Sequence, residues 1–215
     1  MKIYAISGLG ANEKVYERLV LPIGYNLYFI PWLIPQENET IDSYALRMSM
    51  NIDTTEEFIL FGLSFGGIMA QEIAKIKHPQ KLILFDTIKN EKEKPYWISI
   101  NNYVPLYRIF PNFLLNNDRM IELYTWFLSM FNSDRPNLSQ IYTFRDDRYT
   151  NWAFRQIIQW KNKDFDQSKT YHIHGTHDFV FPIYNISNPI KVKNGGHVAV
   201  YEKAEIVSEI LRELL

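Results

Sequence analysis

Along the first 86 residues, short apolar runs alternate with segments in which apolar and polar residues are mixed. This pattern predicts strands and helices in alternation. Short apolar runs at 2–7, 27–30, 58–61 and 81–85 have the length and composition of buried strands. Between them, apolar residues recur every three or four positions, which is typical of a helix with one buried face. Because strand and helix alternate, we expect an α/β fold with a parallel sheet covered by helices on both faces.

Polar residues with short side chains stand where helices are expected to begin. Asn12 is expected to cap a helix that runs to Leu19, and Thr40 to cap the next one. The clearest helix starts at Phe65, directly after the strand at 58–61.

The pattern changes after Asp86. From 87 to 169 we find no strand pattern, and the segment holds 17 of the chain's 33 aromatic residues. Its clearest helices are expected at 119–131 and 151–160. Strands resume at 170–174 and 189–192, and a last helix is expected at 200–215. We therefore expect a core formed by 1–86 and 170–215, with 87–169 inserted as a helical cap.

The sequence Gly62-Leu63-Ser64-Phe65-Gly66 lies between the strand at 58–61 and the helix after it. A serine in such a G-x-S-x-G turn adopts a strained backbone conformation, and glycines are needed because a Cβ would collide with the neighbouring strand or helix. The turn exposes the serine Oγ at a helix N-terminus, where backbone N–H groups can stabilise an oxyanion. A glycine-rich turn without chemistry is the alternative, and the flanking strand and helix favour the nucleophile.

Two later stretches carry an acid and a base. His174-Gly175-Thr176-His177-Asp178 follows one strand, and Gly195-Gly196-His197 follows the last. Both are expected at the carboxyl edge of the sheet, where Ser64 lies and where ligands bind in open α/β sheets. Asp178 is the favoured acid, and Asp86, which ends the strand at 81–85, is the alternative. His197 is the favoured base, and a surface histidine is its alternative.

Three other features of that edge need an interpretation. His172, His174 and His177 suggest a metal site, but the turn before Asp178 explains them better, so we expect no metal. Trp32, after the second strand, either lines a substrate pocket or packs in the core. Gly8, in the Ser7-Gly8-Leu9-Gly10 turn, is a further pocket candidate.

Composition narrows the choice of function. The 215 residues carry a net charge of -1 and no cysteine, so the chain shows neither a polyanion-binding surface nor a thiolate metal site. We see no signal peptide and no apolar run long enough for a membrane span. We expect a cytoplasmic protein with a small-molecule substrate and without a cofactor, nucleic acid or membrane partner. The oligomeric state stays open.

The three motifs around Ser64, Asp178 and His197, in that order, resemble the signatures of the α/β-hydrolase superfamily. The resemblance covers the chain except the cap. It implies that Ser64 is the nucleophile, His197 the general base and Asp178 the orienting acid. It also implies an oxyanion hole made by the backbone N–H groups of Leu9 and Phe65.

The sequence departs from that family in two places. Many members have His-Gly in the oxyanion loop, where this chain has Ser7-Gly8. The first strand is predicted to begin at residue 2, so we expect a minimal core without the usual N-terminal antiparallel strands.

The resemblance implies a serine hydrolase that acts on a small, apolar carboxylic ester through an acyl-enzyme. A C–C bond hydrolase or lyase with the same triad is an alternative. A catalytically silent protein that binds a small ligand is another. We expect the cap to lie over Ser64 and to contribute at least two aromatic side chains to the pocket wall.

Overall fold

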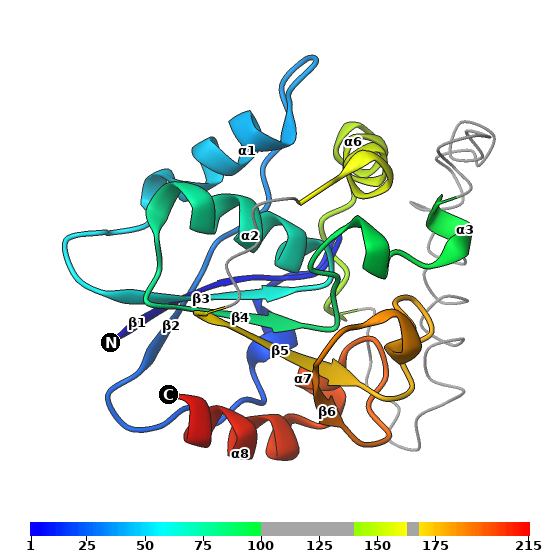
Figure 1. Ribbon diagram of the computed structural model, residues 1–215. Helices are drawn as coiled ribbons and strands as arrows, with labels where there is room; N and C mark the ends of the chain where they lie inside the picture. The colour runs from blue at the N-terminus through cyan, green and yellow to red at the C-terminus, as the bar shows by residue number, and fades with distance from the viewer. Residues whose placement is uncertain (100–139, 163–167) are drawn as a thin grey trace.

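A parallel sheet forms the centre of the protein (Figure 1). The computed structural model describes residues 1–99, 140–162 and 168–215. In these residues six strands pair in the order β2-β1-β3-β4-β5-β6, and all neighbours are parallel. The strands are β1 Lys2–Ile6, β2 Asn26–Phe29, β3 Phe58–Leu63, β4 Lys81–Phe85, β5 Thr170–Gly175 and β6 Ile190–Val192. The predicted parallel α/β sheet is confirmed.

Helices cover both faces of this sheet. The α-helices are α1 Ile41–Met48, α2 Phe65–Lys77, α3 Tyr96–Ser99, α6 Asp147–Gln159, α7 Ala199–Glu202 and α8 Ala204–Leu214. Short 3-10 helices are η1 Glu13–Tyr16, η2 Ser49–Asn51, η3 Glu91–Glu93 and η7 Ile183–Asn185. In Figure 1, α1 and α2 lie on one face and α8 on the other.

Each face of the sheet has its own apolar core. All six residues of β3 are buried, as its apolar sequence predicts for a central strand. One core joins side chains of α1, α2 and α6, among them Tyr44, Ile68 and Trp152. The other joins side chains of η1, α7 and α8, among them Val207 and Leu211. The sheet is therefore anchored on both sides, and its carboxyl edge is a fixed base for a site.

Two helix predictions are wrong in extent. Asn12 caps a helix as expected, but that helix is only the short η1, and Leu19 lies beyond it. Tyr16 is buried there and donates a hydrogen bond to the Ile6 carbonyl at 2.8 Å, which ties the turn to β1 instead of extending the helix. The helix expected at 200–215 is divided into α7 and α8, because Lys203 has non-helical backbone angles of φ -125° and ψ 40°.

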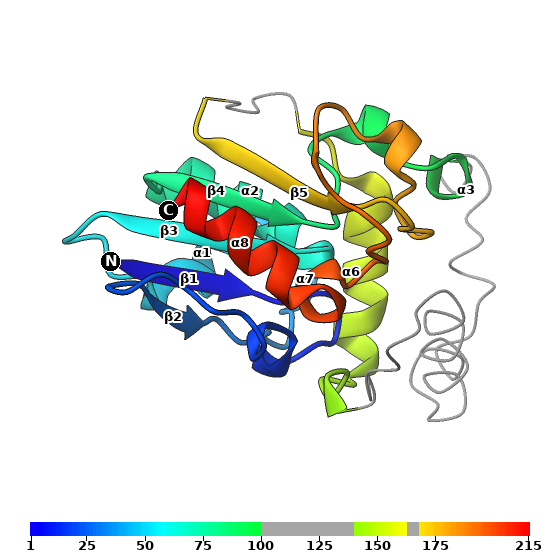
Figure 2. The same cartoon turned by 90° about the horizontal axis from the view of Figure 1, so that it is seen from below.

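Part of the predicted cap is described. Helix α6 begins at Asp147, and the Asp146 side chain caps its first turn. The helix lies beyond the carboxyl ends of the strands (Figure 2). The helix expected at 119–131 falls outside the described residues, and the cap boundaries at 87 and 169 stay a prediction. Among the helices of the described ranges, none combines the length and apolar character needed to cross a membrane.

Candidate active site

Ser64 lies on a sharp turn between β3 and α2. Its backbone angles are φ 52° and ψ -121°, a conformation that costs a side-chain-bearing residue about 1–3 kcal/mol. The turn is held by two hydrogen bonds: Ser64 N donates to the Phe85 carbonyl at 2.9 Å, and Thr87 Oγ1 donates to the Ser64 carbonyl at 2.7 Å. A Cβ added at Gly66 would lie 2.1 Å from the Ser7 carbonyl oxygen, so only glycine fits there. The strained turn predicted from the sequence is present.

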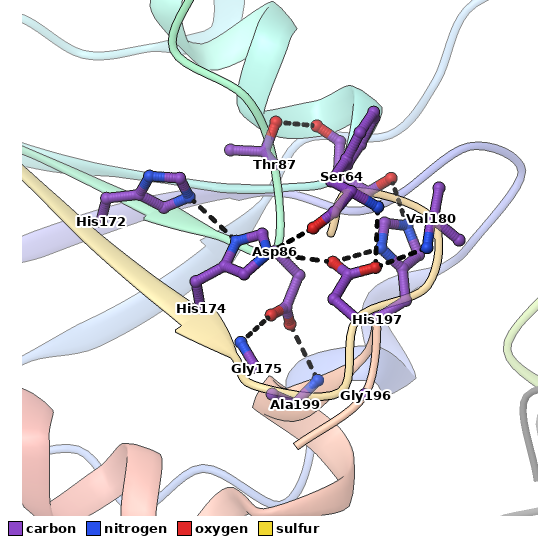
Figure 3. Close-up of polar contacts among 12 residues, drawn as sticks. Ser64, Asp86, Thr87, His172, His174, Gly175, Val180, Gly196, His197 and Ala199 are labelled. Carbon is purple, nitrogen blue, oxygen red and sulfur yellow. Dashed lines mark hydrogen bonds and ion pairs between the residues drawn. The ribbon is translucent and has the colours of Figure 1, made fainter. Parts of the chain in front are cut away.

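Ser64, His197 and Asp178 form a continuous chain of hydrogen bonds (Figure 3). Ser64 Oγ lies 2.8 Å from His197 Nε2, and His197 Nδ1 lies 2.9 Å from Asp178 Oδ2. A carboxylate can only accept, so Nδ1 carries the proton and donates to Asp178. Nε2 is then free to accept the proton of Ser64 Oγ. The contact expected between Asp178 and His197 is present, and the three side chains stand in the geometry that activates a serine.

Backbone contacts fix the positions of the acid and the base. Asp178 Oδ1 accepts hydrogen bonds from Val180 N at 2.8 Å and Phe181 N at 2.9 Å, which leaves Oδ2 for His197. The turn after β5 touches the turn after β6, because a Cβ on Gly175 would lie 2.4 Å from the Gly195 carbonyl oxygen. The two glycine-containing turns therefore pack backbone against backbone, and this brings Asp178 and His197 together.

Asp86, the alternative acid, has a different place. It is 1% exposed, and its oxygens accept hydrogen bonds from Gly175 N and Ala199 N, both at 2.8 Å (Figure 3). Burial and the nearby Asp178 carboxylate raise the pKa of Asp86 well above its usual range. Asp86 joins the Asp178 turn to the segment after His197, whereas Asp178 contacts the imidazole.

A second histidine, His174, also lies close to Asp178, and the sequence did not predict this contact. His174 Nε2 lies 2.8 Å from the Phe181 carbonyl and 3.3 Å from Asp178 Oδ2. Its Nδ1 lies 3.3 Å from His172 Nε2, so the two side chains share a face of β5, as strand alternation predicts. Burial lowers the pKa of both imidazoles. Both are therefore neutral, and of the two only His174 is shown in contact with Asp178. His177 is exposed on the turn.

The same neighbourhood offers a set of possible metal ligands. One ligand atom each from Asp86, His174 and Asp178 lies within 4.8 Å of the others. Each of these side chains already has protein partners: Asp86 accepts from two amides, Asp178 from two amides and His197, and His174 faces the Phe181 carbonyl. Among the described residues, this cluster is best explained as a hydrogen-bond network that supports the acid.

The charge state of His197 reflects two opposing effects. Burial disfavours the imidazolium and lowers the pKa, whereas the Asp178 carboxylate raises it by attraction and by its hydrogen bond. Burial is the largest single effect, but Asp86 and Glu202 add to the effect of Asp178, and together they place the pKa of His197 above its usual value.

The turn after β1 approaches Ser64, as expected for Leu9 and Gly8. A Cβ added at Gly8 would lie 3.5 Å from the Ser64 Cβ. Within the described chain, no backbone hydrogen bond uses the N–H of Leu9 or Phe65 as donor. Trp32 is 5% exposed and stacks on Phe65 with ring centroids 5.2 Å apart, so it packs in the core. Contact of Gly8 or Trp32 with a substrate stays a prediction.

Two aromatic side chains of α6 pack around these residues. The Tyr149 ring lies 5.4 Å from Trp32, and the Tyr149 hydroxyl accepts a hydrogen bond from Gly10 N at 3.4 Å. The Trp152 ring lies 6.1 Å from Phe65, edge to face. The described part of the cap thus supplies aromatic contacts next to Ser64, and a pocket wall made by them stays a prediction.

Comparison with known proteins identifies the fold. No protein-family model and no curated protein matches this sequence. Among solved structures, a thermophilic esterase from Thermogutta terrifontis aligns with a TM-score of 0.70 and 16% identity, over 100% of this chain and 89% of that one. MenH from S. aureus aligns with a TM-score of 0.72 and 17% identity, over 100% and 93% of the two chains. An epoxide hydrolase from Bacillus megaterium aligns with a TM-score of 0.71 and 11% identity, over 99% and 92%. With its parallel sheet and its strand–serine–helix turn, the chain has the α/β-hydrolase fold.

Proposed function

We propose that this protein is a serine hydrolase that cleaves a small, apolar carboxylic ester. The observation that carries the proposal is the Ser64–His197–Asp178 chain, with its 2.8 Å and 2.9 Å contacts. Two of the structurally similar proteins are described as an esterase and an epoxide hydrolase, which agrees with hydrolysis. The aromatic surroundings of Ser64 favour an apolar substrate.

In the first half of the proposed reaction, Ser64 Oγ attacks the ester carbonyl while His197 Nε2 takes the Oγ proton. Asp178 holds the imidazole in the required tautomer and stabilises the imidazolium that forms. The N–H groups of Leu9 and Phe65 bind the oxyanion of the tetrahedral intermediate. Collapse of that intermediate expels the alcohol, which takes the proton from His197, and leaves an acyl-Ser64 ester.

In the second half, water attacks the acyl-enzyme. His197 removes a proton from the water, and a second tetrahedral intermediate forms in the same oxyanion hole. When it collapses, Ser64 Oγ regains its proton from His197 and the carboxylic acid leaves. Each step needs only the three side chains, the two backbone donors and water.

The test is to replace Ser64 by Ala and to measure hydrolysis of p-nitrophenyl esters of graded chain length. We expect a loss of several orders of magnitude in kcat, since the three side chains act as a unit. Ser208→Ala is the matched control, because Ser208 is a buried serine on α8 whose hydroxyl donates to the Ala204 carbonyl, away from the site. It should keep wild-type activity.

Covalent labelling separates this proposal from its alternatives. A fluorophosphonate should modify Ser64 and no other residue, as read by peptide mass spectrometry. Labelling without turnover of any ester would favour the C–C bond hydrolase or lyase, and no labelling at all would favour a silent binding protein. Activity of Ser64→Ala within about tenfold of wild type would remove Ser64 as the nucleophile.

A further inference from the structure

Trp32 makes an unusual pair of contacts with the turn after β1. Its indole N–H points at two acceptors, the Gly8 carbonyl at 3.0 Å and Ser7 Oγ at 3.1 Å. The side chain is 5% exposed, so its N–H has no access to bulk water and needs protein acceptors. The indole is therefore attached to the backbone of the loop that approaches Ser64.

The Gly8 carbonyl and the Leu9 N–H belong to one peptide unit. That unit is planar and trans, so the C=O and the N–H point in opposite directions and move together. The Gly8 carbonyl accepts from Trp32 Nε1 and also from Ala11 N, at 3.0 Å. Two donors to the Gly8 carbonyl oxygen thus fix the orientation of the peptide unit, and with it the direction of the Leu9 N–H at its opposite edge.

Trp32 also contacts the residue that carries the second proposed oxyanion donor. Its ring stacks on Phe65, with centroids 5.2 Å apart and an angle of 10° between the planes. Phe65 is the first residue of α2, and its N–H points out of the helix N-terminus beside Ser64. One side chain therefore touches both Leu9's peptide unit and Phe65.

We propose that Trp32 is a positioning residue that aims the Leu9 N–H at the oxyanion and holds it in register with Phe65. The proposal rests on the serine-hydrolase function proposed above. Ser7 has a supporting part: its Oγ accepts from Trp32 and donates to the Ala11 carbonyl at 2.6 Å, which closes the loop on itself. The Ser7-Gly8 sequence stands where many α/β-hydrolases have His-Gly. In this chain it accepts hydrogen bonds from a tryptophan that follows the neighbouring strand β2.

A second tryptophan provides a matched control. Trp152 lies in the same apolar core and also contacts Phe65, at 6.1 Å between centroids. Its indole N–H donates to the Glu39 carbonyl at 2.7 Å, away from the oxyanion loop. Trp32→Phe and Trp152→Phe remove the same atoms from the same core, and they differ in the acceptor that loses its donor.

The experiment compares an ester with the thionoester of the same acyl group and the same alcohol. Sulfur accepts hydrogen bonds poorly, so an enzyme with two well-aimed donors prefers the ester, and this preference falls when a donor is misaimed. For Trp32→Phe we expect kcat on the ester to fall roughly tenfold or more, with little change in KM and a several-fold lower ester-to-thionoester rate ratio. For Trp152→Phe we expect the ratio to stay at the wild-type value.

A purely structural role for Trp32 would lower the stability or the amount of folded enzyme and leave the rate ratio unchanged, and that result overturns the proposal. If Trp32→Phe does not fold, site-specific replacement of Trp32 by benzothienylalanine keeps the ring shape and removes only the N–H donor, and the same ratio decides. Wild-type protein that hydrolyses neither substrate and shows no Ser64 labelling would overturn the proposed function itself. An active wild type with an unchanged ratio in the variant overturns only the role of Trp32.

Discussion

The two halves of the candidate site differ in how much they depend on buried side-chain hydrogen bonds. Ser64 is placed by backbone segments in van der Waals contact, where a Cβ on Gly66 would lie 2.1 Å from the Ser7 carbonyl oxygen. Asp178 and His197 share a close backbone contact of the same kind, between Gly175 and the Gly195 carbonyl, but they depend in addition on buried side-chain hydrogen bonds, including the two that Asp86 accepts from Gly175 N and Ala199 N at 2.8 Å. A steric constraint of this kind fails completely when one atom is added, whereas a hydrogen-bonded one can lose a member and keep part of its geometry.

This contrast predicts a different response to mutation on the two sides. In the Ser64 half, large effects should come not only from Ser64 but also from residues that never touch a substrate. In the Asp178–His197 half, effects should be graded according to the distance from the imidazole. The following predictions test this difference, from the largest expected effect to the smallest.

Gly66→Ala should abolish activity and strongly lower the melting temperature. The new Cβ must push α2 away from β1, because its three nearest neighbours are backbone atoms of Ile6 and Ser7. Overpacking typically costs about 1–3 kcal/mol and occasionally more, and a shift of Ser64 by about 1 Å alone would cost about 10²-fold in rate. Here the strained turn that holds Ser64 is itself displaced, so both the stability of the fold and the alignment of Ser64 with His197 should be lost. Circular dichroism melting and p-nitrophenyl ester hydrolysis measure the two effects.

Gly24→Ala is the control for Gly66→Ala. Gly24 has a φ of +92° with no atom within 4 Å of its Cβ position, so this change tests conformational strain alone. It should destabilise the fold moderately and leave kcat unchanged. If Gly66→Ala were as mild, the steric account of the Ser64 half would be wrong.

Asp178→Asn should lower kcat by about four orders of magnitude, the size of the same change in a serine protease triad. The amide can donate to His197 Nδ1 and so favours the wrong tautomer, and it cannot stabilise the imidazolium. The fold should survive, since Oδ1 still accepts from Val180 N and Phe181 N. Steady-state kinetics together with a melting curve check both statements, and retention of a tenth of the activity would contradict the role of Asp178.

Asp86→Asn should cost less activity, about 10–100-fold, and measurably reduce stability. Asparagine has one acceptor oxygen, so either Gly175 N or Ala199 N loses its partner, and a buried unpaired donor costs about 1–3 kcal/mol. The loss should appear in kcat more than in KM, because the two turns shift relative to each other. An activity loss larger than that of Asp178→Asn would transfer the acid role to Asp86.

The sequence predicted the Ser64 half well because its constraint leaves a direct trace in residue type. Gly62 and Gly66 flank Ser64 at positions where only glycine fits, and the strand and helix on either side are continuous in sequence. The same holds for the parallel sheet, since buried strands and amphipathic helices follow from local periodicity.

The supporting contacts of the other half were not predicted. Asp86 accepts hydrogen bonds from residues 89 and 113 positions away, and nothing in its local sequence indicates those partners. The contact between His174 and Asp178 had a weak signal, because alternation placed His172 and His174 on one face of the strand. For Trp32, the sequence could not decide between a place in the pocket wall and a place in the core, since the direction of an indole N–H depends on tertiary structure.

The smallest expected effect is a shift in the pH profile, and it tests the charge balance around His197. His197 must be neutral to accept the Ser64 proton, so kcat/KM should fall as the pH drops through the pKa of His197 in the free enzyme. Burial lowers that pKa, but Asp178, Asp86 and Glu202 together raise it more, so the midpoint of the acid limb should lie above the usual value of 6.5. Asp178→Asn removes the strongest of the effects that oppose burial and leaves only those of Asp86 and Glu202, so the midpoint of its residual activity should move to lower pH. His177→Gln, on the exposed part of the turn, should leave the profile unchanged.

The measurement is kcat/KM for an uncharged ester from about pH 5 to 9 at constant ionic strength. A wild-type midpoint below 6.5, or an upward shift in Asp178→Asn, would show that desolvation and not the acid controls the base.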